Sequence, residues 1–322
     1  MEGFIKNIFD IQTKSDFEEM CMHAFHYQMQ NNSIYFEYAS LILKNTIPNN
    51  YTEIPFLPVE FFKQKQIICQ GKKLEKIFLS SGTKGERSKH LVSDLSIYKE
   101  SFTKSFHYFY GDINDYCILA LLPSYSEHED SSLIYMTDHL LKKTNYSKSN
   151  YYINNYEDLN ATIQELEAKE KKTILFGVTY ALLDFAIMYP QKLQHTIIME
   201  TGGMKGKKKE LVKQEVHDIL KNAFSAENIH SEYGMTELLS QAYSKKNNVF
   251  QTPPWMEVLI RDINDPLSIN QVNTGGINII DLANIYSCPF VATQDLGKLY
   301  ENGFSILGRM KESDLRGCNL LI

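Results

Sequence analysis

The chain has 322 residues, of which 43% are hydrophobic and 22% are charged, so it can bury a full core as one large domain or two. Its net charge of -6 gives no basic footprint for nucleic-acid binding. No run of eighteen apolar residues is present and the N-terminus lacks the apolar stretch of a signal peptide, so we expect a cytoplasmic protein without a membrane span.

The five cysteines are scattered and never stand in Cys-x-x-Cys spacing: Cys21, Cys69, Cys117, Cys288 and Cys318. Neither a disulfide framework nor a zinc site is therefore predicted. We expect four of the five to be ordinary core thiols.

The first 75 residues carry aromatic and methionine side chains at helical spacing and then meet Pro48, Pro55 and Pro58. This pattern predicts a helical N-terminal segment, 1–75, that ends in an extended stretch. From residue 76 to residue 252, short apolar runs alternate with amphipathic stretches, which is typical of an α/β body in which helices wrap a sheet. The runs are 77–79, 117–122, 174–176 and 197–199.

One helix of this body is expected over residues 208–224, with an apolar face made of Leu211, Val212, Val216, Ile219, Leu220 and Phe224. After residue 252 the helical pattern ends. Strands are predicted over 256–263 and 276–281, and a hairpin over 297–307 turns around Glu301-Asn302-Gly303. Residues 253–322 are thus expected to form a β-rich subdomain with a mobile C-terminal tail.

The first stretch with chemical content is L-S-S-G-T-K-G-E-R-S-K-H, residues 79–90, directly after a predicted strand. Its glycines let the backbone close on an anion, and its hydroxyls and cations supply donors, so it suits a polyphosphate. The spacing differs from that of a Walker A loop. The alternative is a solvated Ser/Gly turn with surface lysines.

Three further stretches also follow predicted strands. M-E-T-G-G-M-K-G-K (199–207) has paired glycines that permit close approach to a planar base, or that simply turn the chain into a helix. Y-G-M-T-E (233–237) combines an aromatic face, a turn, a hydroxyl and a carboxylate, or only caps a helix. Asp295 is expected at a strand-to-turn junction, where it and Arg309 suit a ribose, unless D-L-G is an ordinary β-turn.

Taken together, the four stretches resemble the motifs of the adenylate-forming synthetases, the superfamily of acyl-CoA synthetases, luciferases and amino-acid-activating domains. Within it, E-T-G-G-M-K-G, S-E-Y-G-M-T-E-L-L-S-Q and R-G-C-N-L-L are most similar to acyl-protein synthetases of the LuxE type. The resemblance covers roughly residues 76–317. It implies the large-domain α/β fold of these enzymes, with a helical N-terminal cap and a β-rich C-terminal subdomain, but without their usual small C-terminal domain.

The resemblance also implies the site residues. ATP would be bound by Ser80, Ser81, Gly82, Thr83, Lys84, Gly85, Gly202, Gly203, Tyr233, Gly234, Thr236, Asp295 and Arg309. Glu237 would bind Mg²⁺, and the catalytic residues would be Lys84, Thr236, Glu237 and Cys318. Two departures from the family pattern stand in the phosphate loop: Lys84 replaces a second threonine, and the usual Pro-Lys ending is Ser88-Lys89.

The implied activity is ATP-dependent conversion of a carboxylic acid, expected to be a fatty acid, into an acyl-adenylate. The acyl group would then pass to Cys318 and on to a partner such as an acyl reductase. Apolar stretches at 116–141 and 176–189 are candidates for the acyl pocket. Two alternatives stay open: a ligase that uses CoA or another soluble thiol with an acyl or aryl acid, and a nucleotide-binding protein without catalysis.

Overall fold

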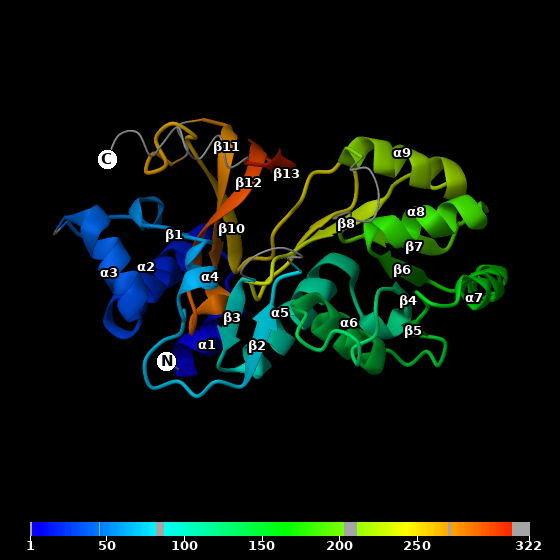
Figure 1. Cartoon of the computed structure of the whole chain (residues 1–322), viewed down its shortest axis with the longest axis horizontal. Helices are drawn as coiled ribbons and strands as arrows, with labels where there is room; N and C mark the ends of the chain where they lie inside the picture. The colour runs from blue at the N-terminus through cyan, green and yellow to red at the C-terminus, as the bar shows by residue number, and fades with distance from the viewer. Residues whose placement is uncertain (1, 45, 82–86, 203–210, 270–271, 311–322) are drawn as a thin grey trace. The chain divides into compact units, whose positions relative to one another are not determined.

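The computed structural model describes residues 2–44, 46–81, 87–202, 211–269 and 272–310 (Figure 1). The chain divides into two compact units. Unit 1 comprises residues 1–101, 235–240 and 251–322, and unit 2 comprises residues 102–234 and 241–250. The division into segments 1–75, 76–252 and 253–322 stays a prediction.

Unit 2 is built on a six-stranded sheet in the order β5-β4-β6-β7-β8-β9. The first five strands in this order are parallel, and β9 is antiparallel to β8. Their bounds are β4 Cys117–Leu121, β5 Asn150–Tyr151, β6 Thr173–Gly177, β7 Thr196–Glu200, β8 His230–Tyr233 and β9 Ala242–Ser244. Three of the predicted apolar runs are therefore confirmed as neighbouring parallel strands, which are apolar throughout because both faces are covered.

Helices cover both faces of this sheet, as Figure 1 shows for α8 and α6. Alternate strand residues, such as Leu119, Leu175 and Ile198, pack against α7, α8 and α9. The intervening residues, such as Ile118, Ile174 and Met199, face α5 and α6. The helix bounds are α5 Leu95–Tyr110, α6 Ser132–Lys143, α7 Tyr156–Ala168, α8 Thr179–Met188 and α9 Lys213–Phe224. The predicted α/β body is confirmed.

The helix expected over 208–224 begins at Lys213, and its predicted apolar face is partly wrong. Val216, Leu220 and Phe224 are buried, but Val212 is 65% exposed and Ile219 is 38% exposed. The Glu215 carboxylate accepts a hydrogen bond from the Val212 backbone N–H at 3.1 Å, which fixes the helix start one residue later. Val212 therefore has an extended backbone and lies outside the helix.

Unit 1 holds a five-stranded sheet in which the long strand β12 pairs with β1, β11 and β13. The bounds are β1 Leu57–Pro58, β10 Met256–Arg261, β11 Thr274–Asp281, β12 Phe290–Tyr300 and β13 Gly303–Arg309. The predicted strands and the hairpin around Glu301-Asn302-Gly303 are confirmed. Strand β12 begins earlier than expected, and this changes the setting of Asp295.

The apolar run 77–79 lies in unit 1, outside the sheet of the α/β body. Within the described ranges, strand β2 (Lys76–Leu79) pairs with the antiparallel strand β3 (Lys89–Val92) alone, in a two-stranded sheet. Phe78 is fully buried whereas its neighbour Ile77 is 39% exposed. This one-sided burial is typical of a surface hairpin, so the run was wrongly grouped with the strands that are buried on both faces.

The N-terminal helical prediction is confirmed. The helices are α1 Glu2–Ile8, α2 Lys14–Asn31, α3 Ser33–Leu43 and the short α4 Phe61–Gln64. A capping box between Thr13 and Asp16 begins α2, which buries Phe17, Cys21 and Phe25 on one face. Cys21, Cys69, Cys117 and Cys288 are all buried and free, as expected of core thiols.

Candidate functional site

The predicted phosphate loop connects the two strands of the β2–β3 hairpin. Leu79 lies opposite Lys89 in the register, so residues 80–88 leave and re-enter the same end of the hairpin. The base of the loop is closed by two bonds: the Ser80 N–H donates to the Ser88 carbonyl at 3.1 Å, and the Ser88 N–H donates to the Ser80 hydroxyl at 3.0 Å. Ser81 is exposed at the loop entrance. Gly82, Thr83, Lys84 and Gly85 lie outside the described residues.

Thr236 and Glu237 begin a short irregular segment, residues 236–240, that belongs to unit 1. The fully buried carboxylate of Asp281 accepts hydrogen bonds from the Leu239 N–H at 2.7 Å, the Ser240 N–H at 3.0 Å and the Ser240 hydroxyl at 2.6 Å. Burial raises the pKa of Asp281 to about 6, although these hydrogen bonds oppose the change. A single side chain on β11 thus anchors the segment that carries the predicted metal ligand.

The carboxyl group of Glu237 is enclosed in unit 1, with the residue 5% exposed. Burial raises its pKa, while a hydrogen bond from the Ser88 side chain and the charge of Arg309 act in the opposite direction. A buried carboxyl group in such a setting favours a nearby cation. Unit 1 therefore brings together the base of the predicted phosphate loop, Glu237 and Arg309.

Asp295 and Arg309 face each other across β12 and β13, where they are register partners. The Arg309 Nε atom lies 3.2 Å from Asp295 Oδ1, and the Arg309 side chain is 57% exposed whereas that of Asp295 is 8% exposed. The expectation that Asp295 lies at a strand-to-turn junction is wrong, because β12 continues to Tyr300. Sequence reasoning placed the turn too early, since the Gly297 that suggested it lies inside the strand.

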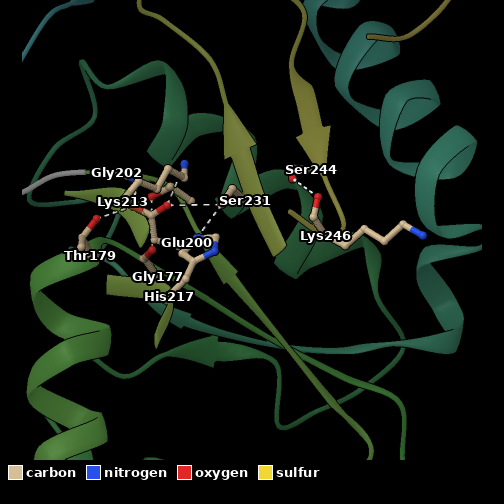
Figure 2. A network of polar contacts seen from close by, with 10 residues as sticks. Gly177, Thr179, Glu200, Gly202, Lys213, His217, Ser231, Ser244 and Lys246 are labelled. Atoms are coloured by element: carbon tan, nitrogen blue, oxygen red, sulfur yellow. Dashed lines mark hydrogen bonds and ion pairs between the residues drawn. The ribbon is translucent and has the colours of Figure 1, made fainter. Parts of the chain in front are cut away.

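In unit 2, Gly202 follows β7 and is held by the carboxylate of Glu200 (Figure 2). Gly202 has φ = +78°, a conformation that favours glycine, and its N–H donates to Glu200 Oε1 at 2.7 Å. The Gly202 carbonyl accepts from the Thr179 N–H at 2.9 Å, and the Thr179 hydroxyl also donates to Glu200. Glu200 therefore ties the predicted adenine turn to the start of α8. Gly203 lies outside the described residues.

Glu200 carries its charge inside unit 2 because a cation lies beside it. Burial acts to raise its pKa, but Lys213, whose Nζ atom lies 3.1 Å from Glu200 Oε2, outweighs burial together with the hydrogen bonds, and the pKa is lowered. The Ser231 hydroxyl lies 3.4 Å from the same carboxylate and 3.2 Å from His217 Nε2. Burial and the nearby Lys213 lower the pKa of His217 to about 4, which keeps the ring neutral beside the ion pair.

Tyr233 ends β8, and its ring makes an edge contact with Phe250 at a centroid distance of 5.9 Å. Lys213 Nζ lies 4.8 Å from the centroid of the same Phe250 ring. A Cβ atom added at Gly234 would lie 2.6 Å from the Glu232 carboxyl oxygen, so a larger residue there would force this buried carboxyl group to move. Burial raises the pKa of Glu232 to about 8, with the charge of Glu200 adding to the change and Lys213 opposing it.

The two units divide the predicted site residues between them. Ser80, Ser81, Thr236, Glu237, Asp295 and Arg309 belong to unit 1, whereas Gly202, Tyr233 and Gly234 belong to unit 2. The boundary falls inside Y-G-M-T-E, between Gly234 and Met235. Cys318, the predicted acyl carrier, lies outside the described residues.

A small apolar cavity of about 10 Å³ lies in unit 2 between the sheet and helices α5 and α6. It is lined by Phe106, Ile118, Thr137, Leu140, Ile174, Phe176, Met199 and Tyr243. Four of these residues fall in the stretches 116–141 and 176–189 that were proposed to line an acyl pocket. The volume is close to that of a single water probe, so an acyl chain would need these side chains to move.

Sequence reasoning missed the buried residues that support the motifs. Asp281 is more than forty positions from the amides it binds, and Glu200 pairs with Lys213, thirteen positions further along the chain. No local pattern in the sequence indicates either pairing. A carboxylate at the end of an apolar strand, as at Glu200 and Asp281, is a weak signal that the side chain is buried and needs a partner.

No helix in the described ranges is both long enough and apolar enough to cross a membrane. Within the same ranges, no three His, Cys, Asp or Glu side chains gather as ligands of one metal ion. A magnesium ion is commonly held by one or two carboxylates together with substrate phosphates, so a single carboxylate such as Glu237 is compatible with that role.

Solved structures of adenylate-forming enzymes have the same fold. ATP-bound MatB from Rhodopseudomonas palustris is 17% identical, with a TM-score of 0.55 over 75% of this chain and 49% of that one. 2-Hydroxyisobutyryl-CoA ligase in the postadenylation state, in complex with 2-HIB-AMP, is 10% identical, with a TM-score of 0.65 over 93% of this chain and 69% of that one. The predicted fold class is confirmed, and the chain spans about half the length of MatB.

An open form of 2-hydroxyisobutyryl-CoA ligase in complex with 2-HIB-AMP and CoA gives a TM-score of 0.60 at 10% identity, over 93% of this chain and 76% of that one. No curated protein sequence matches the chain. The profile of the family described as acyl-protein synthetase, LuxE, matches residues 9–322. Because this match extends over nearly the whole sequence, the chain belongs to the LuxE family of acyl-protein synthetases.

Proposed function

We propose that the protein activates a carboxylic acid, and specifically a fatty acid, by forming an acyl-adenylate from ATP. The observation that carries this proposal is the grouping of Glu237, Ser88 and Arg309 in unit 1 of a LuxE-family chain. A substrate carboxylate oxygen attacks the α-phosphorus of ATP, the bond from that phosphorus to the bridging oxygen breaks, and pyrophosphate leaves. MatB binds ATP and 2-hydroxyisobutyryl-CoA ligase binds an acyl-AMP on the same fold, which supports this reaction class.

The proposed ATP contacts follow the chemistry of each side chain. Hydroxyls and backbone amides of residues 80–85 hold the β- and γ-phosphates, and Thr236 donates to the α-phosphate. The Asp295 carboxylate accepts hydrogen bonds from the ribose hydroxyls, and the exposed Arg309 beside it binds the ribose or a phosphate. Tyr233, Gly234, Gly202 and Gly203 enclose the adenine.

Glu237 is the proposed ligand of Mg²⁺. Its carboxyl group is buried and its pKa is raised by that burial, and a divalent cation would offset the cost of the buried charge. When bound, the ion neutralises the charge that develops on the departing pyrophosphate. Ser88 contributes by orienting the carboxylate through its hydrogen bond.

We further propose that the acyl group passes to Cys318. The thiolate sulfur attacks the acyl carbonyl carbon, a thioester forms, and AMP leaves with the electron pair of the broken acyl-phosphate bond. A partner protein, such as an acyl reductase, then takes the acyl group from the thioester. A second candidate is transfer to CoA or another soluble thiol, which is supported by the likeness to a ligase that binds CoA. A third is nucleotide binding without catalysis.

The test is the intact mass of the protein after incubation with ATP, Mg²⁺ and a mixture of fatty acids, with pyrophosphate measured in the same tube. We expect a hydroxylamine-labile adduct on the wild type and none on Cys318→Ser, which still releases pyrophosphate. Glu237→Gln should lower pyrophosphate release, whereas Glu165→Gln, at an exposed ion pair of α7, should not.

Each other outcome supports one of the alternatives. Pyrophosphate release without an adduct on the wild type would favour a soluble thiol acceptor. ATP binding without carboxylate-dependent pyrophosphate release would refute the enzymatic proposal.

A further inference from the structure

His90 lies on β3, two residues after Ser88 at the base of the predicted phosphate loop, and its side chain is fully buried in unit 1. Its ring meets the Phe62 ring edge-on at a centroid distance of 6.0 Å. The proposed ATP site does not use this histidine directly. A buried polar ring must nevertheless find hydrogen-bond partners, so its contacts indicate what it holds.

Both ring nitrogens of His90 contact groups that fix the segment carrying Thr236 and Glu237. The Nδ1 atom lies 2.7 Å from the Thr236 carbonyl oxygen, and Nε2 lies 2.9 Å from Asn284 Oδ1. Asn284 ends the short 3-10 helix η3 (Leu282–Asn284), and its Nδ2 atom donates to the Glu237 carbonyl at 2.8 Å and to the Cys288 carbonyl at 3.0 Å. His90 and Asn284 therefore hold the carbonyl groups of two consecutive site residues.

These two carbonyl groups depend on side chains because neither belongs to a helix or a strand. A carbonyl oxygen accepts only, so the Thr236 contact requires a proton on Nδ1 of His90. The Asn284 amide directs its NH₂ group at two carbonyls, so its oxygen faces Nε2 of the ring. Burial lowers the pKa of His90 to about 4, and a neutral ring has a single N–H, so the hydrogen bond by which His90 holds the segment is the one from Nδ1 to Thr236. Replacing His90 with an apolar ring would leave the Thr236 carbonyl without this donor while filling much of the same volume.

We propose that His90, through its hydrogen bond to the Thr236 carbonyl, is a positioning residue that fixes the main chain at Thr236 and Glu237 relative to the strand leaving the phosphate loop. The α-phosphate donor and the magnesium ligand are thereby held in register with the loop. The expected effect on the rate of adenylation rests on the proposed function. The hydrogen bond between His90 and Thr236 lies within unit 1 and does not depend on that function. The Asp281 carboxylate holds the other end of the segment, so the loss of His90 frees mainly the end at Thr236.

The test compares His90→Phe, His90→Gln and Asn284→Ala with the control Gln28→Ala. Gln28 is fully buried in unit 1, and its Nε2 atom donates to the Ile285 carbonyl at 2.6 Å. The control thus removes a buried side-chain amide that binds the same 284–288 segment. It leaves the hydrogen bonds to the Thr236 and Glu237 carbonyls intact. Each variant is assayed for kcat and KM(ATP) in carboxylate-dependent pyrophosphate release and for its melting temperature.

We expect His90→Phe and Asn284→Ala to lower kcat by about 100-fold with a smaller change in KM(ATP), since a shift of about 1 Å in a catalytic group costs that much. His90→Gln keeps one amide donor and should recover part of the rate. Gln28→Ala should lose thermal stability but keep kcat. A rate unchanged in folded His90→Phe, or lost equally in Gln28→Ala, would overturn the positioning role.

Two readouts that need no activity separate this inference from the proposed function. Hydrogen exchange should accelerate in peptides covering 236–240 in His90→Phe but not in Gln28→Ala. The emission of Trp255, the single tryptophan, should stay unchanged, because its Nε1 atom donates to the Ser240 hydroxyl at 3.0 Å, at the end of the segment that Asp281 holds. If the wild type releases no pyrophosphate, the proposed function fails, and unchanged exchange in His90→Phe would independently refute the link through His90.

Discussion

Glu232→Gln is the substitution that should change the pH dependence of stability most clearly. Glu232 is 7% exposed on β8, and burial raises its pKa from 4.5 to about 8. Between those two pH values the folded protein holds a proton that the unfolded chain has lost. Stability therefore falls as the pH rises through this window, and the contribution present below pH 4.5 is gone above pH 8.

The expected slope from this one group approaches about 1.4 kcal/mol per pH unit inside the window, and the total loss is at most about 5 kcal/mol. Glutamine has nearly the same shape as the protonated acid and cannot ionise. We therefore expect Glu232→Gln to match the wild type near pH 5 and to exceed its stability by about 2 kcal/mol or more at pH 8. The charge of Glu200 works in the same direction, so part of the effect depends on that neighbour.

The assay is urea unfolding from pH 5 to pH 8.5, followed by far-ultraviolet circular dichroism and by hydrogen exchange of peptides from β8. Fluorescence of Trp255 follows unit 1 separately, since this residue lies in that unit. Glu165→Gln, at the exposed end of an ion pair on α7, is the matched control and should retain the pH dependence of the wild type. Parallel stability curves for Glu232→Gln and the wild type would refute the argument that a buried neutral carboxyl group is present.

Three further substitutions test the packing and the site. Gly234→Ala should lower the melting temperature and cost about 1–3 kcal/mol, because the new Cβ would lie 2.6 Å from the buried Glu232 carboxyl; an unchanged melting temperature would contradict this. Phe185→Ala, in the core of unit 2, should lower the free energy of unfolding in urea by about 3–5 kcal/mol. Ile187→Ala, on the same helix but 70% exposed, should lower it by less than about 0.5 kcal/mol, and equal losses would refute the assigned burial. Asp295→Ala should raise the Kd for ATP at least about tenfold by calorimetry through loss of a charged ribose acceptor, and unchanged binding would remove Asp295 from the proposed site.

Much of the secondary structure was predictable because it is encoded within a few consecutive residues. The apolar runs at 117–122, 174–176 and 197–199 form neighbouring parallel strands of one sheet, and the hairpin at 301–303 lies where its glycine predicted it. The wrong predictions concern local patterns that are compatible with two structures. The run at 77–79 resembles a strand that is buried on both faces, but it forms a surface hairpin with β3. Gly297 resembles a turn residue, but it lies inside β12, where it pairs with β13.

The candidate site shows the same division. The chemical groups and their order can be read along the chain, since hydroxyls, glycines and carboxylates at the ends of strands define what each motif is able to bind. The distant side chains that complete the motifs become visible only in the folded chain: Asp281 bound to the amides of residues 239–240, Lys213 beside Glu200, and His90 against Thr236, which is 146 positions away. The physical reason is that burial and charge pairing depend on distances between atoms in space, and no local periodicity specifies those distances.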